Sequence, residues 1–517
     1  MLNTFSSFAC GKTGAKNAPP DFFPVPEERA IFMLGEWRCH VKYQQFMVDV
    51  VNREFKRNPN AIKQYEEAFL KMHLMNLDSV RSDFAPLFSV TGKPSNQQPE
   101  IFRSLVLMSH FKRSGLEEWI TLAKSSVLLC ALVGVTPDTF PGESTHRDFI
   151  TRLWQYNSIG KLRNVARKPK SKHGKEKQPP KRPGVIKYLV DKAIAGQTFG
   201  KIPERLLQAV FTKVALVPSA TMGLLGDTSK LIIAGDGTCI ESNASSYGVR
   251  VCSCESKCDC PRKFSDPNAR WGWDSYHERW FFGHTAYLLS VHNPKLKLDL
   301  PIYIKFVEAQ RFDGVTFISA LAHARHIYKD FLTFDSVLLD SAHDNYSTYS
   351  LLKHWNIKPF IDLNKRQSAE VKLQNILLNH NGEPICADGH IMSNWGFDAK
   401  KYRIKYRCPL KTGRVKWCPY AENCNKSAYG KIVYLRLAQD LRLLTPIPRN
   451  SPEWDEIYKQ RTAAERVNNR ILTDYELERP KRYGKKKLAF FVFANAVNVH
   501  LDAHIKFGSL TVDALNS

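Results

Sequence analysis

The spacing of apolar residues changes near position 230, and this change leaves few fold classes open to the chain. From 29 to 160 apolar residues recur every three or four positions, which predicts helices. Beyond 230 short apolar runs alternate with helical stretches, which predicts a mixed sheet flanked by helices. We therefore expect an α/β fold preceded by an all-helical region.

Five strands are expected between 230 and 364. The order in which strands and helices follow one another predicts how the sheet is built. Three strands are followed by a helix, a strand, a second helix and a fifth strand. After a segment of mixed pattern, Ser451 and Pro452 predict the start of a further helix, because serine caps helices and proline is tolerated in the first turn. The expected strands span 231–234, 284–291, 302–307, 336–339 and 358–362, and the expected helices span 317–331 and 346–355.

Basic residues strongly outnumber acidic ones. The 517 residues include 75 Lys and Arg against 50 Asp and Glu, a net charge of +25 that favours a polyanionic partner such as nucleic acid. Between 161 and 187 eleven basic residues stand against the single acid Glu176, and such a block repels itself into a solvated segment. It is either a flexible tether or an arm that contacts phosphates, and the net charge favours the arm. The candidate contacts are Lys168, Lys170, Lys172, Lys175 and Lys177.

Export and membrane insertion are not expected. The N-terminal residues lack the apolar core of a signal peptide, and the stretches 126–135 and 488–499 are shorter than the roughly 18 apolar residues of a membrane span. Twelve cysteines are too few for a disulfide scaffold in a chain of this length, and they indicate reduced thiols. We expect a cytoplasmic, nucleoid-associated protein without a membrane partner.

Three acids occupy positions where catalytic sites collect. Asp236 follows the first expected strand between two glycines that leave room for a ligand, and Asp340 ends the fourth strand. In a sheet of this order strands one and four can be neighbours, which would bring both carboxylates together. Glu465 lies on the last helix, where the spacing of Tyr458, Arg461 and Glu465 places all three on one face.

The chemistry of three clustered carboxylates limits what such a site does. Each acid alone is as well explained by a turn or a surface position. Together they repel one another and need cations, and hard divalent ions with oxygen ligands meet that need. Two Mg²⁺ ions about 3.5–4 Å apart activate a nucleophile and stabilise a leaving oxygen, which indicates phosphoryl transfer on nucleic acid. The expected metal ligands are Asp236, Asp340 and Glu465, and Mn²⁺ is expected to replace Mg²⁺.

Three blocks of sequence resemble the signature blocks of bacterial insertion-sequence transposases. They are IIAGDGT at 232–238, LDSAHD at 339–344, and the pattern of Tyr458, Arg461 and Glu465. The resemblance covers about 100–505 and implies an RNase H-like catalytic domain with an Asp-Asp-Glu triad. The intervals of 104 residues from Asp236 to Asp340 and of 125 from Asp340 to Glu465 fit that family, and the longer one implies an insertion domain.

The resemblance also implies roles for these residues. The three acids would hold two Mg²⁺ ions, while Tyr458 and Arg461 would position phosphate near the cut. The helical N-terminal region would read the element ends, so the partner is double-stranded DNA as element end and as target. Two ends must be cut together, which implies a homodimer in a synaptic complex.

One departure from the family concerns the residue after the catalytic glutamate. The family motif continues to a lysine seven residues later, and here that position is Leu472. Arg466, Arg470 or a lysine of 485–487 is expected to take its place, so Arg466 and Arg470 are further candidates for DNA contact. Asn468 either touches the DNA backbone or belongs to a solvated helix face.

Two cysteine sets suit a metal ion. Each set is either a structural Zn²⁺ site or a group of free thiols, and neither has a paired general base that would make it catalytic. The first set is spaced more tightly than usual zinc pairs, and the second resembles a ribbon. The sets are Cys252, Cys254, Cys258 and Cys260, and Cys386, Cys408, Cys418 and Cys424.

The chain is thus expected to have six segments and one leading function. That function is transposition; the alternatives are a non-catalytic, zinc-bearing transposase relic that binds DNA, and an RNase H-like nuclease that cuts without joining. His343 and Asp344 are an exposed histidine and a capping aspartate, or else groups that support the site. The segments are a loose leader at 1–28, a DNA-binding helical region at 29–160, a basic linker and helical connection at 161–229, the first part of the catalytic core at 230–364, an insertion at 365–449, and the last catalytic helices at 450–507.

Overall fold

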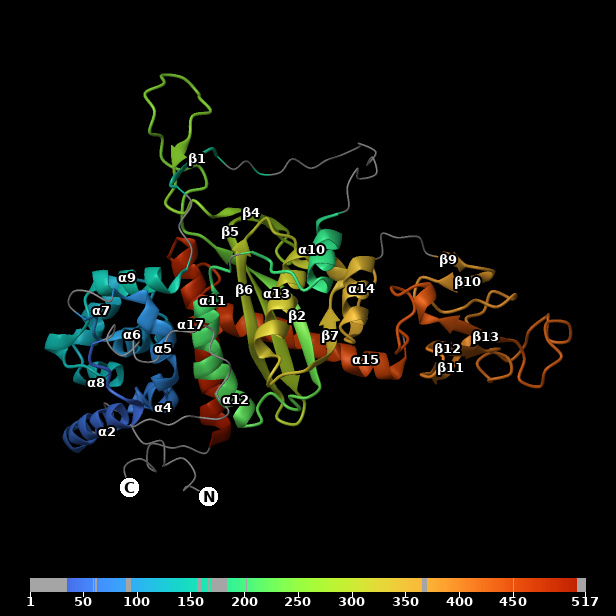
Figure 1. Cartoon of the computed structure of the whole chain (residues 1–517), viewed down its shortest axis with the longest axis horizontal. Coiled ribbons are helices and arrows are strands. Elements are labelled where there is room, and N and C mark those ends of the chain that lie inside the picture. Colours follow the sequence, from blue (N-terminus) through green and yellow to red (C-terminus); the bar gives the residue numbers. More distant parts are fainter. Residues whose placement is uncertain are drawn as a thin grey trace.

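The computed structural model describes residues 35–508 apart from 59, 61–62, 90–93, 156–159, 166–167, 169–183, 201, 365–369 and 450. A central sheet separates a group of helices at one end of the molecule from a set of short strands at the other (Figure 1). The leader at 1–28 and the candidates Lys170, Lys172, Lys175 and Lys177 lie outside the described residues.

Helices make up most of the described chain before the central sheet, and the short strand β1 (Leu162–Arg163) lies among them. The expected helical stretches at 101–108 and 119–123 fall within α6 and α7, and α8 ends at Gly134, whose φ of 100° suits a residue without a side chain. The helices are α2 (His40–Arg57), α4 (Glu66–Leu74), α5 (Arg81–Phe84), α6 (Gln98–His110), α7 (Leu116–Lys124), α8 (Val127–Val133), α9 (Glu143–Leu153), α10 (Val185–Ile194), α11 (Arg205–Phe211) and α12 (Val217–Thr221).

The central sheet has six strands of mixed direction. β5 pairs antiparallel with β4, β2 and β6, whereas β2 pairs parallel with β7 and β7 parallel with β8. The expected neighbourhood of the first and fourth predicted strands is therefore present as the β2–β7 pair. The strands are β2 (Leu231–Glu241), β4 (Arg270–Asp274), β5 (Arg279–Asn293), β6 (Leu298–Glu308), β7 (Phe334–Leu339) and β8 (Lys358–Ile361).

Helices cover both faces of this sheet. α13 (Asp313–Tyr328) contacts β2, β5 and β6, and α10 and α14 (Tyr346–His354) pack beside it. α16 (Thr462–Asn469) contacts the same three strands, and Ala464 shares a buried cluster with Ala234 of β2. Because neighbouring strand residues point to opposite faces, α13 and α16 lie on opposite sides of β2.

Two predicted boundaries are wrong in ways that affect the site. β2 continues to Glu241, so Asp236 lies inside the strand and not after it, because the polar residues 236–239 still pair with β5. The last predicted helix is also divided. Ser451 caps α15 (Pro452–Tyr458) by accepting from the Trp454 amide over 3.2 Å, but a 3₁₀ turn at Lys459–Arg461 separates α15 from α16.

The insertion forms a small β unit with its own core. β9 (Glu370–Leu373) pairs with β10 (Ile376–Asn379), and β11 (Ser393–Asp398), β12 (Arg403–Arg407) and β13 (Ile432–Arg436) form a three-stranded sheet. Nine buried residues, including Leu435 and Tyr406, make up its core. None of these strands was predicted from the sequence.

The last helix, α17 (Lys485–Gly508), joins the two larger parts of the molecule. It packs on α4, α6, α9 and α11 and also on β5 and β6. By length and composition α17 is the one helix among the described residues that is apolar enough to cross a membrane, and 89% of its most apolar window is buried inside the molecule. The helices before residue 154 and the sheet consequently share one hydrophobic core.

Candidate active site

Asp236 lies in the middle of β2, where its two faces meet different helices. A Cβ on Gly237 would come within 2.6 Å of Asp313 Oδ1, at the first turn of α13. On the opposite face of β2, Asn468 of α16 donates a hydrogen bond from Nδ2 to Asp236 Oδ2 over 2.9 Å. The space beside Gly237 is therefore filled by a side chain of the protein, and the predicted room for a ligand is not found there.

Asp340 follows β7 and is held by a short chain of hydrogen bonds. His343 donates from Nδ1 to Asp340 Oδ1 over 2.6 Å, and the Ala342 amide donates to the same oxygen over 3.1 Å. The Tyr287 hydroxyl of β5 lies 2.9 Å from His343 Nε2. His343 is 1% exposed, so the prediction of an exposed histidine is wrong, and this residue orients Asp340.

Burial and neighbouring charges raise the pKa values of Asp236 and Asp313, whereas the pKa of Asp340 is lowered. Burial, together with the negative charges of Asp313 and Asp340, raises the pKa of Asp236 to about 7. Burial also raises the pKa of Asp313, and Asp340 adds to this shift. Burial acts upward on the pKa of Asp340 as well, but the hydrogen bond and charge of His343 outweigh it and leave that pKa below its usual value.

Tyr458, Arg461 and Glu465 stand beside these acids. The Tyr458 hydroxyl donates to the Leu339 carbonyl over 3.1 Å, which ties α15 to the end of β7. Arg461 donates to Glu465 Oε1 over 2.6 Å, and its positive charge contributes to the low pKa of Asp340. Burial acts to lower the pKa of Arg461, but the interactions with Tyr458, Glu465 and, to a smaller extent, Asp236 outweigh burial and raise that pKa. Arg461 therefore interacts with all three predicted metal ligands: through charge with Asp236 and Asp340, and through a hydrogen bond with Glu465.

The three predicted metal ligands differ in setting. Asp236 is largely enclosed, whereas the side chains of Asp340 and Glu465 are 45% and 51% exposed. Within the part of the chain that the structure describes, their oxygens do not form a group within 4.8 Å of one another. Glu465 is directed to Arg461 instead.

Two residues of this site, Asp313 and Tyr287, were not singled out from the sequence, and Asn468 was considered only for DNA contact or as part of a solvated helix face. Asp313 looks like an ordinary acid at a helix start, Tyr287 like a core aromatic, and Asn468 like a solvated helix residue. Of these residues only Asn468 could have been found from the sequence, because it lies about one helical turn after Glu465 and therefore near the same helix face. The others reach the site through β5 and α13, whose placement the sequence pattern does not give.

The predicted DNA-contacting residues that the structure describes differ in whether an acid already pairs with them. Lys168 is exposed. Arg466 forms an ion pair with Asp299 at 2.5 Å, and Arg470 forms one with Asp502 at 2.6 Å. A phosphate that bound either arginine would compete with that internal acid.

The first cysteine set forms a group that could hold a metal ion such as zinc. All four sulfurs lie within 4.8 Å of one another, with 3.3 Å between Cys252 and Cys258 and 3.8 Å between Cys254 and Cys260. A hydrogen bond from Arg250 lowers the pKa of Cys252, whereas hydrogen bonding with neighbouring thiols raises that of Cys260. Four thiolates at this spacing need a cation to ionise together.

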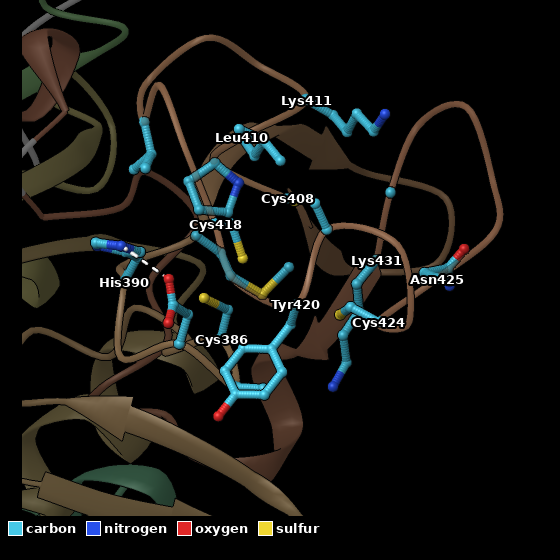
Figure 2. Close-up of a pocket in the computed structure, with 17 residues that line it drawn as sticks. Cys386, His390, Cys408, Leu410, Lys411, Cys418, Tyr420, Cys424, Asn425 and Lys431 are labelled. Carbon is cyan, nitrogen blue, oxygen red and sulfur yellow. Dashed lines mark ion pairs between the residues drawn. The ribbon is translucent and has the colours of Figure 1, made fainter.

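The second cysteine set lines a small cavity in the insertion. The cavity, of about 30 Å³, also contacts Asp388 and His390, which form an ion pair at 3.1 Å (Figure 2). Among the described residues these sulfurs are not a group within 4.8 Å. The wider spacing leaves Cys386, Cys408, Cys418 and Cys424 as lining residues without a preformed tetrahedron.

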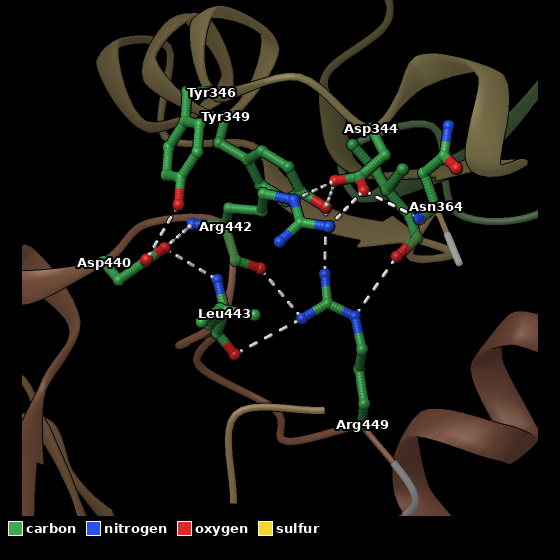
Figure 3. Close-up of polar contacts among 9 residues, drawn as sticks. Asp344, Tyr346, Tyr349, Asn364, Asp440, Arg442, Leu443 and Arg449 are labelled. Atoms are coloured by element: carbon green, nitrogen blue, oxygen red, sulfur yellow. Dashed lines mark hydrogen bonds and ion pairs between the residues drawn. The ribbon is translucent and has the colours of Figure 1, made fainter. Parts of the chain in front are cut away.

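A buried polar network connects the insertion to the segment after Asp340. Asp344, whose side chain is 0% exposed, accepts two hydrogen bonds from Arg442, at 2.8 and 2.6 Å, and one from the Asn364 amide (Figure 3). Arg449 donates to the Tyr349 hydroxyl and to the Ile361 carbonyl. Asp344 therefore does not cap a helix, as one prediction held; it fixes the returning end of the insertion.

No protein-family model matches this chain, and no curated protein matches its sequence.

Proposed function

We propose that the protein is a DNA transposase that binds the ends of its mobile element, cuts the strands and transfers them to target DNA. The observation that carries the proposal is the parallel pairing of β2 with β7, which brings Asp236 of β2 and Asp340, directly after β7, close enough for the charge of Asp340 to raise the pKa of Asp236. Carboxylates held together in this way are typical of metal-dependent phosphoryl transfer.

An RNase H-like catalytic domain is the finer fold that we propose. It is supported by the antiparallel series β6, β5 and β2 followed by β7 and β8 in parallel. The insertion between β8 and α15 agrees with the long interval before Glu465.

The oxygen donors of the site suit two Mg²⁺ ions, with Mn²⁺ as a substitute. Asp236, Asp340 and Glu465 would hold them. The raised pKa of Asp236 supports this fit, because a nearby cation offsets the cost of ionising a buried carboxyl among other acids. When bound, the ions would activate the attacking oxygen and stabilise the leaving oxygen of a phosphodiester.

The remaining residues position these groups. His343 holds the Asp340 carboxylate through its Nδ1 hydrogen, and Asn468 holds Asp236. The Arg461 guanidinium, 23% exposed, has donors left for a phosphate oxygen beyond the one directed to Glu465. Tyr458 fixes the distance between α15 and the end of β7.

The partner in this proposal is double-stranded DNA, as element end and as target. The net charge of +25 and the basic stretch at 161–187 support it, since contacts to phosphates supply most of the affinity that does not depend on sequence. We further propose a homodimer in the synaptic complex, a cytoplasmic, nucleoid-associated location, and Zn²⁺ as the ion of the first cysteine set.

Strand cleavage and joining by point variants test the proposal. Asp236→Asn, Asp340→Asn and Glu465→Gln should each lower cleavage of a labelled element end by on the order of 10³-fold or more, because each removes a charge that holds the ions. Binding of the same duplex in a gel shift should be kept. The matched control is Glu456→Gln, an exposed acid of α15, which should cleave normally.

The outcomes separate the alternatives. Cleavage without joining would favour a nuclease, and DNA binding without any cleavage by the wild type would favour a relic. Normal cleavage by Glu465→Gln would remove this glutamate from the site.

A further inference from the structure

The first cysteine set sits in a loop that is closed at its base by backbone pairing. The Val249 amide donates to the Lys263 carbonyl over 2.7 Å, and the Lys263 amide donates back over 2.8 Å. All four cysteines lie between these two residues. Figure 1 shows this loop extending from the sheet beside β1.

The loop has no apolar core that would hold it in shape. Val249 and Val251 are 63% and 54% exposed, and none of the residues from 249 to 263 is buried. The sulfur spacings of 3.3 and 3.8 Å resemble the edge of about 3.8 Å that a tetrahedron has when four sulfurs lie about 2.3 Å from one ion. Metal ligation is therefore the interaction best suited to fix this loop.

The strand that leaves this loop pairs with the short strand at the start of the basic stretch. β3 (Arg262–Lys263) begins two residues after Cys260 and pairs antiparallel with β1 (Leu162–Arg163). The Phe264 amide adds a hydrogen bond of 2.8 Å to the Lys161 carbonyl. Each strand has only two residues, so the pairing depends on what holds β3 in place.

Side chains of the same stretch rest on residues that follow β3. The Arg163 guanidinium lies 3.9 Å from the Phe264 ring centroid and donates to the Ala269 carbonyl over 3.1 Å. Lys168 Nζ lies 4.7 Å from the Trp271 ring centroid. The start of the basic stretch is thus anchored on the segment that the cysteine loop leads into.

The loop carries exposed charges of both signs, whereas the basic stretch is almost entirely positive. On the loop side the exposed cations Arg250, Lys257 and Lys263 stand beside the exposed acids Glu255 and Asp259, whereas Lys161 and Lys168 are exposed on the side of the stretch. Arg250 also donates to Cys252 Sγ over 3.4 Å, which balances part of the negative charge of a tetrathiolate site. The exposed lysines of the basic stretch suit the phosphates of DNA.

We propose that a metal ion in the cysteine loop controls how tightly the protein holds DNA, by fixing β3 as the anchor of the basic stretch. This inference rests on the proposed function for its DNA partner, whereas the metal and the anchoring do not depend on it. Losing the ion would free β3, β1 would separate from it, and the phosphate contacts of Lys161, Arg163 and Lys168 would no longer be held in one place.

The test uses the full chain as wild type, Cys252→Ser/Cys258→Ser and the control Cys39→Ser, whose cysteine precedes α2 and lies outside both sets. Elemental analysis should show one equivalent of zinc less in the double variant only. Amide hydrogen exchange at Lys263 and Phe264 should become at least tenfold faster, while amides of β2 and β5 stay protected. Affinity for duplex DNA of any sequence should fall about tenfold.

A second variant separates anchoring from folding. Arg163→Gln keeps the cysteines, so it should keep the zinc and still weaken DNA binding. Unchanged exchange at Lys263 and Phe264 after loss of the ion would overturn the proposal, and so would a wild-type loop that contains disulfides and no metal. If the wild type bound no DNA, the proposed function would fail, while zinc content and exchange would still decide whether the ion anchors β3.

Discussion

Asp236 shows how strongly one carboxyl depends on its neighbours. Its pKa of about 7 exceeds the usual aspartate value of about 3.9 in an unfolded chain. Between these values the folded protein binds a proton that the unfolded chain does not. The stability that this proton contributes is therefore complete below about pH 4 and is lost as the pH rises towards 7.

Asp236→Asn should remove this pH dependence from the metal-free protein. Because one pKa unit corresponds to about 1.4 kcal/mol, the difference in unfolding free energy between wild type and variant should change by a few kcal/mol, as an order of magnitude, between about pH 4 and pH 7. The difference is the quantity to measure, because buried histidines such as His110 and His500 have lowered pKa values and act in the opposite direction.

Denaturant titrations at several pH values give this difference. The exposed Asp330→Asn is the control and should follow the wild type. Mg²⁺ at neutral pH should stabilise the wild type more than Asp236→Asn. Parallel stability curves for wild type and Asp236→Asn would show that Asp236 ionises normally.

At the level of elements, the insertion depends on one buried ion pair. The Asp344 and Arg442 side chains are 0% and 6% exposed, and the chain passes from β13 to α15 through the segment that contains Arg442. Arg442→Met should destabilise the insertion by about 3–5 kcal/mol, because it leaves the Asp344 charge buried and unpaired. Amide exchange at Leu444, which donates to the Asp440 carbonyl, measures this opening.

A second substitution identifies the cause. Asp344→Asn in the Arg442→Met background should recover part of the loss, since the buried charge is then gone. The exposed Arg414→Met is the matched control and should change stability by less than about 0.5 kcal/mol. Equal exchange rates in Arg442→Met and wild type would show that the ion pair does not hold the insertion.

Helices and strands were predicted correctly where buried apolar residues recur at a regular spacing along the sequence. β7 and β8 each end in a buried apolar run and were predicted within two residues of their bounds, and the Ser451 cap was also predicted. β2 was cut short because its second half carries polar residues that pair with β5 across the site. The strands of the insertion were missed because exposed aromatic residues such as Trp395 and Tyr434 interrupt any alternation.

The candidate site was predicted only in part for a related reason. Strand order predicted that the strand of Asp236 and the strand before Asp340 are neighbours, and they pair as β2 and β7. The spacing predicted only that Arg461 and Glu465 share a helix face, and their hydrogen bond was not predicted. Contacts between residues far apart in the chain, such as Asn468 with Asp236, depend on how the helices pack, which local patterns do not encode.

At the scale of the whole molecule there are two main cores of very different size. The larger contains residues of the N-terminal helices, the sheet and α17, where Phe490 meets Phe102 with ring centroids 6.1 Å apart. The smaller consists of nine buried residues of the insertion. No member of one cluster belongs to the other, so heat should unfold the chain in two transitions.

Matched core truncations test this division. Phe490→Ala should lower the larger calorimetric transition, since deleting a buried phenylalanine costs about 3–5 kcal/mol, and it should leave the smaller one in place. Leu435→Ala, at a residue 0% exposed in the insertion, should lower only the smaller transition by about 2–5 kcal/mol. A shift of one common transition by both variants would show that the buried Asp344–Arg442 pair couples the two cores into a single cooperative unit, and Arg442→Met should then separate them.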